Sequence, residues 1–370
     1  MSNTKNHEAD TGQGREADTG QGREADTGQA DTGHGTALWE SRAWRRSAVT
    51  WLDERLAAAG TERTGEVTQP HLRPWGTVLT APTTRGPVWL KAPGPDTAFE
   101  VGLYRLLSRV APDRIPLPIA VDVERGRVLL PDGGTPLGDR VKGAALADAL
   151  VTVLPEYGRL QRDLAPHVED LRALGLTDMR AAVMPRRFDE AAHAVGEYAE
   201  RYGDPSDRDT HRRVSAMRGT FVSWSERLAA ASVPPSLDHN DLHPWNILVA
   251  GTAPVREVRF YDWGDAVVAH PFASMLVALG FLRDHLGVAP DDPAILRPRD
   301  AYLEVFGDLA PHAELVEELE LACRVGRIAR TLVWERSIRA QGHAHAGEFA
   351  RAPLRSFASL PEDSWTALGA

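Results

Sequence analysis

Apolar side chains recur at helical spacing near the beginning of the folded sequence. Between 37 and 59 the recurring positions are Leu38, Trp44, Val49, Leu52 and Leu56. A stripe of this kind is typical of an amphipathic helix, and Gly60 follows it as a stop signal. We therefore expect one helix over 37–59.

Short runs with the composition of β-strands follow this helix. They cover 72–81, 87–92, 117–123 and 126–130, and turn-forming residues at 83–86 join the first two runs. Between the second and third runs an apolar face predicts a single helix, with Phe99, Leu103, Leu106, Leu107 and Val110 on that face. The pattern predicts a small antiparallel sheet accompanied by this helix.

Helical periodicity dominates the rest of the chain. It begins after a turn-rich link at 131–136 and is interrupted at 236–262, where strand-like runs at 247–249 and 255–261 flank the most polar motif. This order predicts a bilobal α/β (α+β) fold. We place a small N-terminal lobe at 37–130, a hinge at 131–136 and a mainly helical C-terminal lobe at 137–370.

The first 36 residues form a separate segment with an eight-residue repeat. The unit EADTGQGR occupies 8–15 and 16–23 and returns in shortened form at 24–29 and 30–35. A calcium-binding repeat would need an apolar residue in each turn to form a core, and the segment has no aromatic or branched apolar residue. Burial cannot offset the entropy of ordering such a sequence, so we predict a disordered tail over 1–36.

Charge and composition narrow the range of partners and locations. The chain has 52 acidic and 42 basic residues and a formal charge of −10, which argues against binding to nucleic acid or to an anionic membrane and favours a cationic small molecule. It has one cysteine, no apolar leader and no apolar run of roughly 20 residues. We expect a cytoplasmic protein without a membrane span. No feature of the sequence indicates an oligomeric state.

The polar motif at 236–262 contains the groups that phosphoryl transfer requires. Transfer to a hydroxyl needs a carboxylate near the acceptor proton and oxygen ligands for magnesium. Asp241, Asn246 and Asp262 supply such groups. The strand-like runs beside these residues predict that their side chains converge, although Asp262 comes 16 positions after Asn246 in the sequence.

Two segments of this motif resemble a known family. His239-Asn-Asp241-Leu-His-Pro-Trp-Asn246 resembles the H-x-D-x-x-x-x-N catalytic loop, and Asp262-Trp-Gly264 resembles the D-F-G magnesium motif. In this form the motifs are similar to those of the aminoglycoside phosphotransferase and choline kinase superfamily, which has a protein-kinase-like fold. The resemblance covers about 37–340.

The resemblance implies a reaction and assigns roles to residues. The protein would be a small-molecule kinase that transfers the γ-phosphoryl group of ATP to a hydroxyl. Asp241 would orient the hydroxyl and accept its proton, and His239 would fix the catalytic loop by hydrogen bonding. Asn246 and Asp262 would hold Mg²⁺.

The nucleotide contacts are also implied by this resemblance. Lys91, in Val88-Trp-Leu-Lys91, would contact the α- and β-phosphates, and Glu100 would hold Lys91. The backbone of the hinge beside Leu130 and Asp132 would bind adenine. GTP in place of ATP remains an alternative.

The sequence departs from the family at two places. No G-x-G-x-x-G precedes Lys91, so another kind of loop must cover the phosphates. Ser274 stands where the family often has Asp in G-x-P-x-x-D-L. We expect Ser274 to cap the helix that follows.

Other interpretations stay open beside the kinase. One is a noncatalytic nucleotide-binding module. Another is a metal-dependent hydrolase, in which His239, Asp241 and His243 would lie on one face of a strand and bind zinc. The acceptor of a kinase could be aminoglycoside-like, an amino alcohol, an amino acid or a sugar. For Trp75, Trp89, Trp245 and Trp263 we expect core packing.

Overall fold

The computed structural model describes residues 36–73, 75–250, 257–339 and 342–368. These residues belong to one compact unit, Gly33–Ala370. The tail predicted at 1–36 lies outside the described residues except for Thr36, and so do residues 255–256 of the strand predicted at 255–261.

A five-stranded antiparallel sheet forms the N-terminal part of this unit. Its strand order is β1-β2-β3-β5-β4. The strands are β1 (Thr68–Arg73), β2 (Gly76–Thr83), β3 (Gly86–Pro93), β4 (Ala120–Asp122) and β5 (Arg127–Pro131). The run predicted at 72–81 therefore covers the end of β1 and most of β2, which are separate strands.

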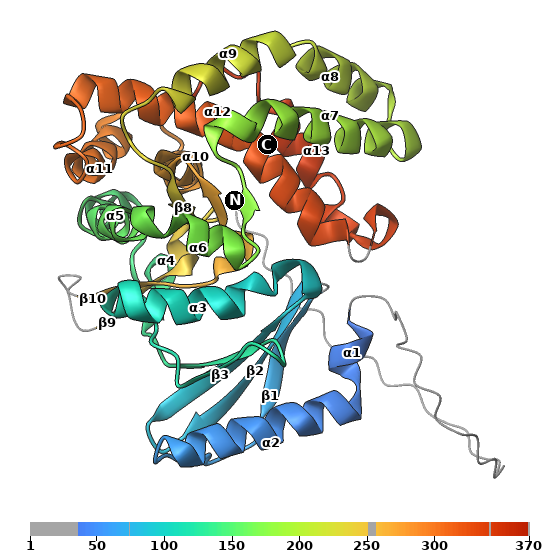
Figure 1. Cartoon of the computed structure of the whole chain (residues 1–370), viewed down its shortest axis with the longest axis vertical. Helices are drawn as coiled ribbons and strands as arrows, with labels where there is room; N and C mark the ends of the chain where they lie inside the picture. The colour runs from blue at the N-terminus through green and yellow to red at the C-terminus, as the bar shows by residue number, and fades with distance from the viewer. Residues whose placement is uncertain (1–35, 74, 251–256, 340–341, 369–370) are drawn as a thin grey trace. The chain divides into compact units, whose positions relative to one another are not determined.

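The helix predicted over 37–59 is divided in two. Helix α1 (Ala37–Glu40) ends at Ser41, and the Ser41 side chain caps α2 (Arg42–Ala58) by accepting a hydrogen bond from the Trp44 amide at 3.1 Å. Leu52 and Leu56 of α2 pack against Leu79 and Leu90 of the sheet. Figure 1 shows α2 along this outer face.

The opposite face of the sheet carries Lys91, a predicted nucleotide contact. Side chains alternate along β3, so that Val88 and Leu90 are buried toward α2 while Trp89 and Lys91 point to the other side. Helix α3 (Phe99–Val110) lies on that side, between the sheet and the helical part of the protein.

Two three-stranded sheets support the polar motif. One has the order β10-β9-β6, with β6 (Thr135–Pro136), β9 (Ile247–Ala250) and β10 (Glu257–Phe260). The other has the order β7-β11-β8, with β7 (Thr177–Asp178), β8 (Ser236–Asp238) and β11 (Val267–Ala269). Because β6 pairs with β9, the predicted hinge at 131–136 ends directly against the segment that follows Asn246.

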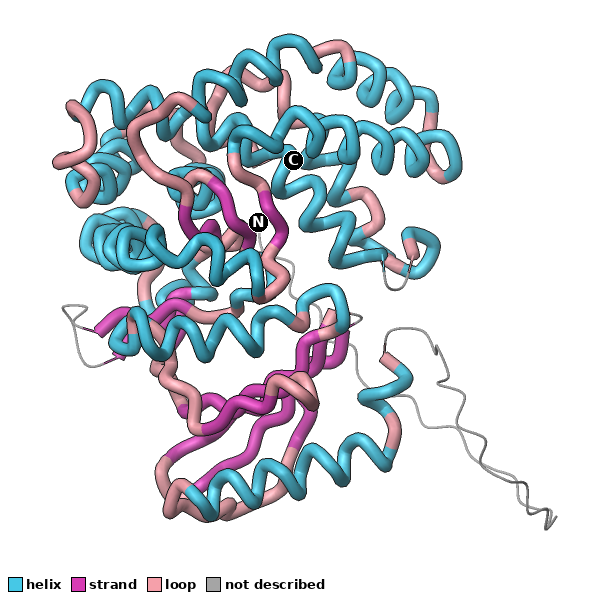
Figure 2. Tube along the Cα trace, viewed as in Figure 1, coloured by secondary structure: helices cyan, strands magenta, loops and turns pink. Residues whose placement is uncertain are grey.

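Helices make up most of the remaining described chain, as Figure 2 shows. They are α4 (Leu137–Arg140), α5 (Ala144–Leu164), α6 (Val168–Ala173), α7 (Met184–Arg201), α8 (Pro205–Ser215), α9 (Arg218–Ala229), α10 (Met275–Leu286), α11 (Pro293–Glu304), α12 (His312–Arg339) and α13 (Ala352–Ala358). None of the described helices is long and apolar enough to cross a membrane. The predicted mixed fold, with a small antiparallel sheet followed by a mainly helical part, is confirmed.

Ser274 differs from its predicted role. It precedes α10, at the end of a short 3-10 turn (Pro271–Ser274), but its side chain makes no capping hydrogen bond. The hydroxyl is fully buried and instead donates to Asp238 at 2.6 Å.

Candidate active site

The β9–β10 hairpin brings Asn246 and Asp262 together. Ile247 pairs with Phe260, so Asn246 and Tyr261 are the next residues along the two chains. The Tyr261 amide donates to the Asn246 carbonyl at 3.3 Å. Asp262 follows directly, which explains how residues 16 positions apart reach one site.

Backbone strain occurs on both sides of this site. Asn240 has φ +62° and Asp262 has φ +64°, and they are the non-glycine residues with positive φ in the described part of the chain. Such conformations cost free energy and persist where the surroundings impose them, often at functional sites. Each of these residues is at or beside a predicted catalytic position.

Asp241 is surrounded by donors. Its carboxylate lies 3.3 Å from His243 Nε2, 3.3 Å from Asn246 Nδ2 and 3.5 Å from Arg330 Nη1 of α12. Burial opposes ionisation of Asp241, but the hydrogen bond with His243 and the charge of Arg330 outweigh it and lower the pKa. Asp241 is therefore an ionised carboxylate at neutral pH.

Lys91 bridges two carboxylates from distant parts of the chain. Its Nζ lies 2.7 Å from Glu100 Oε1 and 2.5 Å from Asp262 Oδ1. Burial would lower the pKa of Lys91, but Asp262 and Glu100 outweigh it and raise the pKa. Glu100 is fully buried and also accepts from the Trp263 amide at 3.0 Å, so it ties Lys91 to the Asp262 segment.

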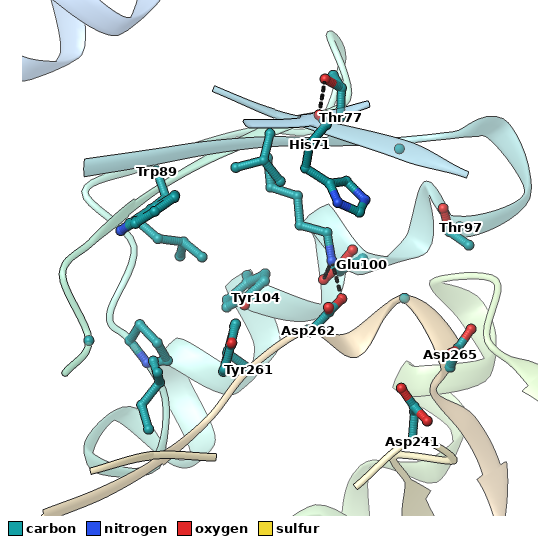
Figure 3. Close-up of a pocket in the computed structure, with 18 of the residues that line it drawn as sticks. His71, Thr77, Trp89, Thr97, Glu100, Tyr104, Asp241, Tyr261, Asp262 and Asp265 are labelled. Carbon is teal, nitrogen blue, oxygen red and sulfur yellow. Dashed lines mark hydrogen bonds and ion pairs between the residues drawn. The ribbon is translucent and has the colours of Figure 1, made fainter. Parts of the chain in front are cut away.

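Lys91, Glu100, Asp241 and Asp262 line a cavity of about 650 Å³. Figure 3 shows Asp241 and Asp265 at one end, Trp89 at the other, and Glu100 and Asp262 between them. Apolar side chains also line the cavity, namely Val78, Leu130 and Leu248, and Leu130 is the β5 residue that pairs with Trp89. The cavity thus has one apolar end and one end rich in carboxylates.

The same arrangement of elements is found among known proteins. Residues 84–315 match the model of the phosphotransferase enzyme family. The chain belongs to this family. The predicted superfamily and the predicted enzyme class, a phosphotransferase, are confirmed.

Two of the similar solved structures share the fold of this chain. An ethanolamine kinase from Plasmodium vivax is similar with a TM-score of 0.58 and 9% identity, over 89% of this chain and 91% of that one. A choline kinase from Cryptosporidium parvum has a TM-score of 0.55 and 14% identity, over 79% and 87%. A macrolide 2'-phosphotransferase from Brachybacterium faecium has a TM-score of 0.46 and 19% identity, over 79% and 96%. No curated protein matches the sequence.

The predicted hinge residues of the phosphotransferase border the apolar end of the cavity. The Leu130 side chain is 6% exposed and lines the cavity together with residues 131–134. Asp132 also lines it, and its Oδ1 accepts from the Gly134 amide at 3.1 Å, which closes a tight turn.

His239 lies behind the cavity and does not line it. Its ring is fully buried, packs 4.7 Å from Trp263 between ring centres, and makes a 2.9 Å hydrogen bond from Nε2 to the Tyr261 carbonyl. Burial lowers its pKa, so the ring is neutral and donates this hydrogen bond. The contact joins the predicted catalytic loop to the Asp262 segment.

The hydrolase alternative does not fit this geometry. Residues 239–243 are not in a strand, because β8 ends at Asp238. The His239 nitrogen Nε2 is bound to a carbonyl, while His243 faces Asp241. In the described residues no three His, Cys, Asp or Glu side chains are grouped so that they could hold a metal ion.

Several residues of the site were not predicted from the sequence. Trp89 was expected in the core, but it is 38% exposed and lines the cavity, as Trp75 does. Trp263, in contrast, is fully buried as expected. Arg330 was not predicted because a single arginine in a long amphipathic helix carries no local signal of its contact with Asp241.

Two further cavity residues have ionisable side chains. Asp265 follows the Asp262 motif, and partial burial together with the Asp241 charge raises its pKa to about 7. His71, on β1, points into the cavity from the sheet (Figure 3). Their positions depend on the pairing of strands and on the 3-10 turn at Trp263–Asp265, which the sequence pattern does not reveal.

Proposed function

We propose that this phosphotransferase moves the γ-phosphoryl group of ATP to a hydroxyl of a small molecule. One observation carries the proposal. Lys91, Glu100 and Asp262, joined by ion pairs of 2.7 and 2.5 Å, share a cavity with an ionised Asp241. A cation for phosphates, an oxygen ligand for a metal and a carboxylate for the acceptor are what this reaction needs.

The cavity supports binding of a nucleotide. A volume of about 650 Å³ lies within the usual range for ligand pockets, which is roughly 300–1,000 Å³. The exposed ring of Trp89 and the side chains of Val78, Leu130 and Leu248 would enclose the purine, and the backbone near Leu130 and Asp132 would bind its edge. Lys91 would then lie beside the α- and β-phosphates.

The donor set also fits magnesium. Asp262 has a side chain 50% exposed at the cavity. The side-chain Nδ2 of Asn246 donates to the Asp241 carbonyl at 2.9 Å and to the Asp241 carboxylate at 3.3 Å. The side-chain Oδ1 of Asn246 would therefore be the metal ligand. Carboxylate and amide oxygens are ligands that Mg²⁺ prefers. When bound, the ion would neutralise charge on the phosphates.

Asp241 would act on the acceptor. Its ionised carboxylate would accept a hydrogen bond from the acceptor hydroxyl and take up its proton as the new oxygen–phosphorus bond forms and the bond to ADP breaks. His243 and Arg330 hold the carboxylate in place and in its ionised form. Lys91 would stabilise the charge on the departing ADP.

The acceptor end of the cavity favours a cationic hydroxyl compound. Asp265 lies there beside Asp241, and the rings of Trp75 and Trp334 line the same cavity. Carboxylates and aromatic faces both attract cations. The fold neighbours named for ethanolamine and choline make amino alcohols the first compounds to test.

The test is release of ADP from ATP, with and without Mg²⁺, across amino alcohols, aminoglycosides, macrolides and sugars. GTP replaces ATP in a parallel series. We expect turnover that requires Mg²⁺ and rises with one acceptor class, and a loss of at least about 100-fold in Asp241→Asn.

Asp209→Asn is the matched control, because Asp209 is an exposed aspartate of α8. It should keep wild-type turnover. Tight binding of ATP without turnover for any acceptor would instead identify a noncatalytic module. Equal turnover in Asp241→Asn would contradict the proposed role of Asp241.

A further inference from the structure

A carboxylate lies buried directly behind the catalytic loop. Asp238 is the last residue of β8 and is fully buried. It does not line the cavity, and within the described residues no basic side chain is within ion-pair distance of it. A buried charge without an ion pair is costly and needs several hydrogen-bond donors around it.

A directed chain of hydrogen bonds ends on this carboxylate. The His239 amide donates to Tyr157 Oη at 3.0 Å, and Tyr157 Oη lies 2.8 Å from Ser274 Oγ. Ser274 Oγ in turn donates to Asp238 Oδ1 at 2.6 Å. The amide can only donate, and Ser274 uses its single hydroxyl hydrogen on Asp238. The Tyr157 hydroxyl hydrogen therefore points to Ser274, and the Ser274 hydrogen points to Asp238.

Asp238 also holds the strained residue that precedes Asp241. The Asn240 amide donates to Asp238 Oδ1 at 2.9 Å, and Asn240 Nδ2 is 3.3 Å from Oδ2. These bonds keep Asn240 at φ +62°. From the other side, Arg330 Nη1 donates to the Asn240 carbonyl at 2.7 Å, and the same nitrogen lies 3.5 Å from Asp241.

The Asp238 carboxylate and the Ser274 hydroxyl form a pair. Position 274 holds a serine, and Asp238 lies on the other side of the 2.6 Å hydrogen bond from it. Carboxylate and hydroxyl are thus in contact, and either position could supply the charge. Tyr157 and the His239 amide lie within 3.3 Å of Ser274 Oγ, so both could donate to a carboxylate placed there.

We propose that Asp238 is a positioning residue for Asp241, supplying from β8 the buried carboxylate that fixes the turn from His239 to Asp241, with Ser274 as its hydroxyl partner. The proposal rests on the proposed function, because it assigns Asp238 an effect through Asp241. Asp238 itself touches neither nucleotide nor acceptor.

An exchange of the two side chains tests the proposal. Three variants are compared with the wild type: Asp238→Ser, Ser274→Asp and the double variant that carries both changes. Turnover, KM for ATP and thermal unfolding are measured for each. Asp238→Ser should lower kcat by roughly 10- to 100-fold and leave KM for ATP unchanged, since the loss is in positioning and not in nucleotide binding.

The double variant gives the decisive result. Ser274→Asp alone places two carboxylates at hydrogen-bond distance and should lower the unfolding temperature strongly. Adding Asp238→Ser to it removes the repulsion, conserves the combined side-chain volume and returns one carboxylate to the cluster. We expect folding and kcat to recover to within about threefold of the wild type, so that the two sites are coupled and not additive.

Two further variants serve as controls for side-chain shape and for the loss of a buried hydroxyl. Asp238→Asn keeps the shape of the side chain and should lose kcat as Asp238→Ser does. Ser225→Ala removes another buried hydroxyl, on α9 and bound to the Phe221 carbonyl, and should leave kcat unchanged. A folded Asp238→Asn with wild-type kcat, or a double variant that is unfolded or no more active than Asp238→Ser, overturns the role of Asp238. Failure of the proposed function looks different, because the wild type itself would then show no transfer with any acceptor.

Discussion

Glu100 shows how one buried side chain can control the proposed nucleotide site. It holds Lys91 at 2.7 Å and the Trp263 amide at 3.0 Å, although its own side chain is fully buried. Glu100→Gln keeps the shape but removes the charge that fixes Lys91. We expect kcat/KM for ATP to fall by about 10- to 100-fold in steady-state kinetics. Glu54→Gln, on the exposed face of α2, should have no effect, and equal kinetics of the two variants would contradict this account.

His71 is a second cavity residue, besides Lys91, that we expect to contact the phosphates. Its ring has no hydrogen bond to any residue that the structure describes, and burial, Arg73 and Lys91 lower its pKa, which Asp262 opposes. A neutral ring keeps an N–H that can donate to phosphate, in a sheet that lacks the glycine-rich loop. His71→Ala should weaken ADP binding by about tenfold, the loss expected for a hydrogen bond to a charged group, and leave adenosine binding unchanged.

Calorimetric titration with ADP and with adenosine separates the two effects. His167→Ala, at an exposed histidine beside α6, provides the control. An equal loss for adenosine would show that His71 supports the shape of the cavity and not the phosphates.

At the scale of elements, the link between the first sheet and β6 depends on a glycine. Gly134 has φ +112°, and a Cβ there would lie 2.6 Å from the Val249 carbonyl oxygen of β9. Gly134→Ala should lower the free energy of unfolding by about 1–3 kcal/mol through backbone strain and should weaken nucleotide binding. Gly219→Ala in α9 meets no atom within 4 Å and should be neutral or stabilising in the same denaturation experiment. Equal effects of the two substitutions would show that the link does not need this backbone shape.

The sequence predicted those elements whose pattern is local. The apolar face of 99–110 gave α3, and the spacing of Asp241, Asn246 and Asp262 identified residues that the β9–β10 hairpin does bring together. Predictions failed where a single side chain or a tertiary contact decides. Ser41 caps α2 and interrupts the helix expected over 37–59, and Ser274 turns inward to Asp238 although its position suits a cap.

Residues that reach the site from remote elements were not predictable. Arg330 reaches Asp241 from α12. Trp89 is exposed to the cavity because it lies on the face of β3 that borders the cavity. Neither position differs locally from a core or surface residue of the same kind. Their role comes from the packing of distant segments, which no spacing along the chain records.

For the whole molecule, we expect stability to decrease in mild acid. Burial lowers the pKa of His270, which is 6% exposed, although Glu318 at 3.7 Å opposes the shift. Below the unfolded pKa of about 6.5, the unfolded chain binds a proton that the folded chain excludes, so the free energy of unfolding falls as pH falls, by up to about 1.4 kcal/mol per pH unit for one group.

His270→Asn should reduce this slope, because asparagine does not titrate. The variant should still fold, because asparagine can accept from the Phe272 amide as His270 Nδ1 does. Chemical denaturation between pH 7.5 and about pH 5 measures the slope, with exposed His167→Asn as the control. An unchanged slope in His270→Asn would mean that His270 is protonated in the folded state.

The central claim concerns where the phosphoryl group goes. Phosphorus NMR of a reaction containing the protein, ATP, Mg²⁺ and the most effective acceptor follows every phosphorus atom at once. We predict one phosphate ester on the acceptor for each ADP formed, and no ester with Asp241→Asn that still binds ATP. Equal amounts of ADP and inorganic phosphate with an unmodified acceptor, or ester formation at the wild-type rate by Asp241→Asn, would contradict the account.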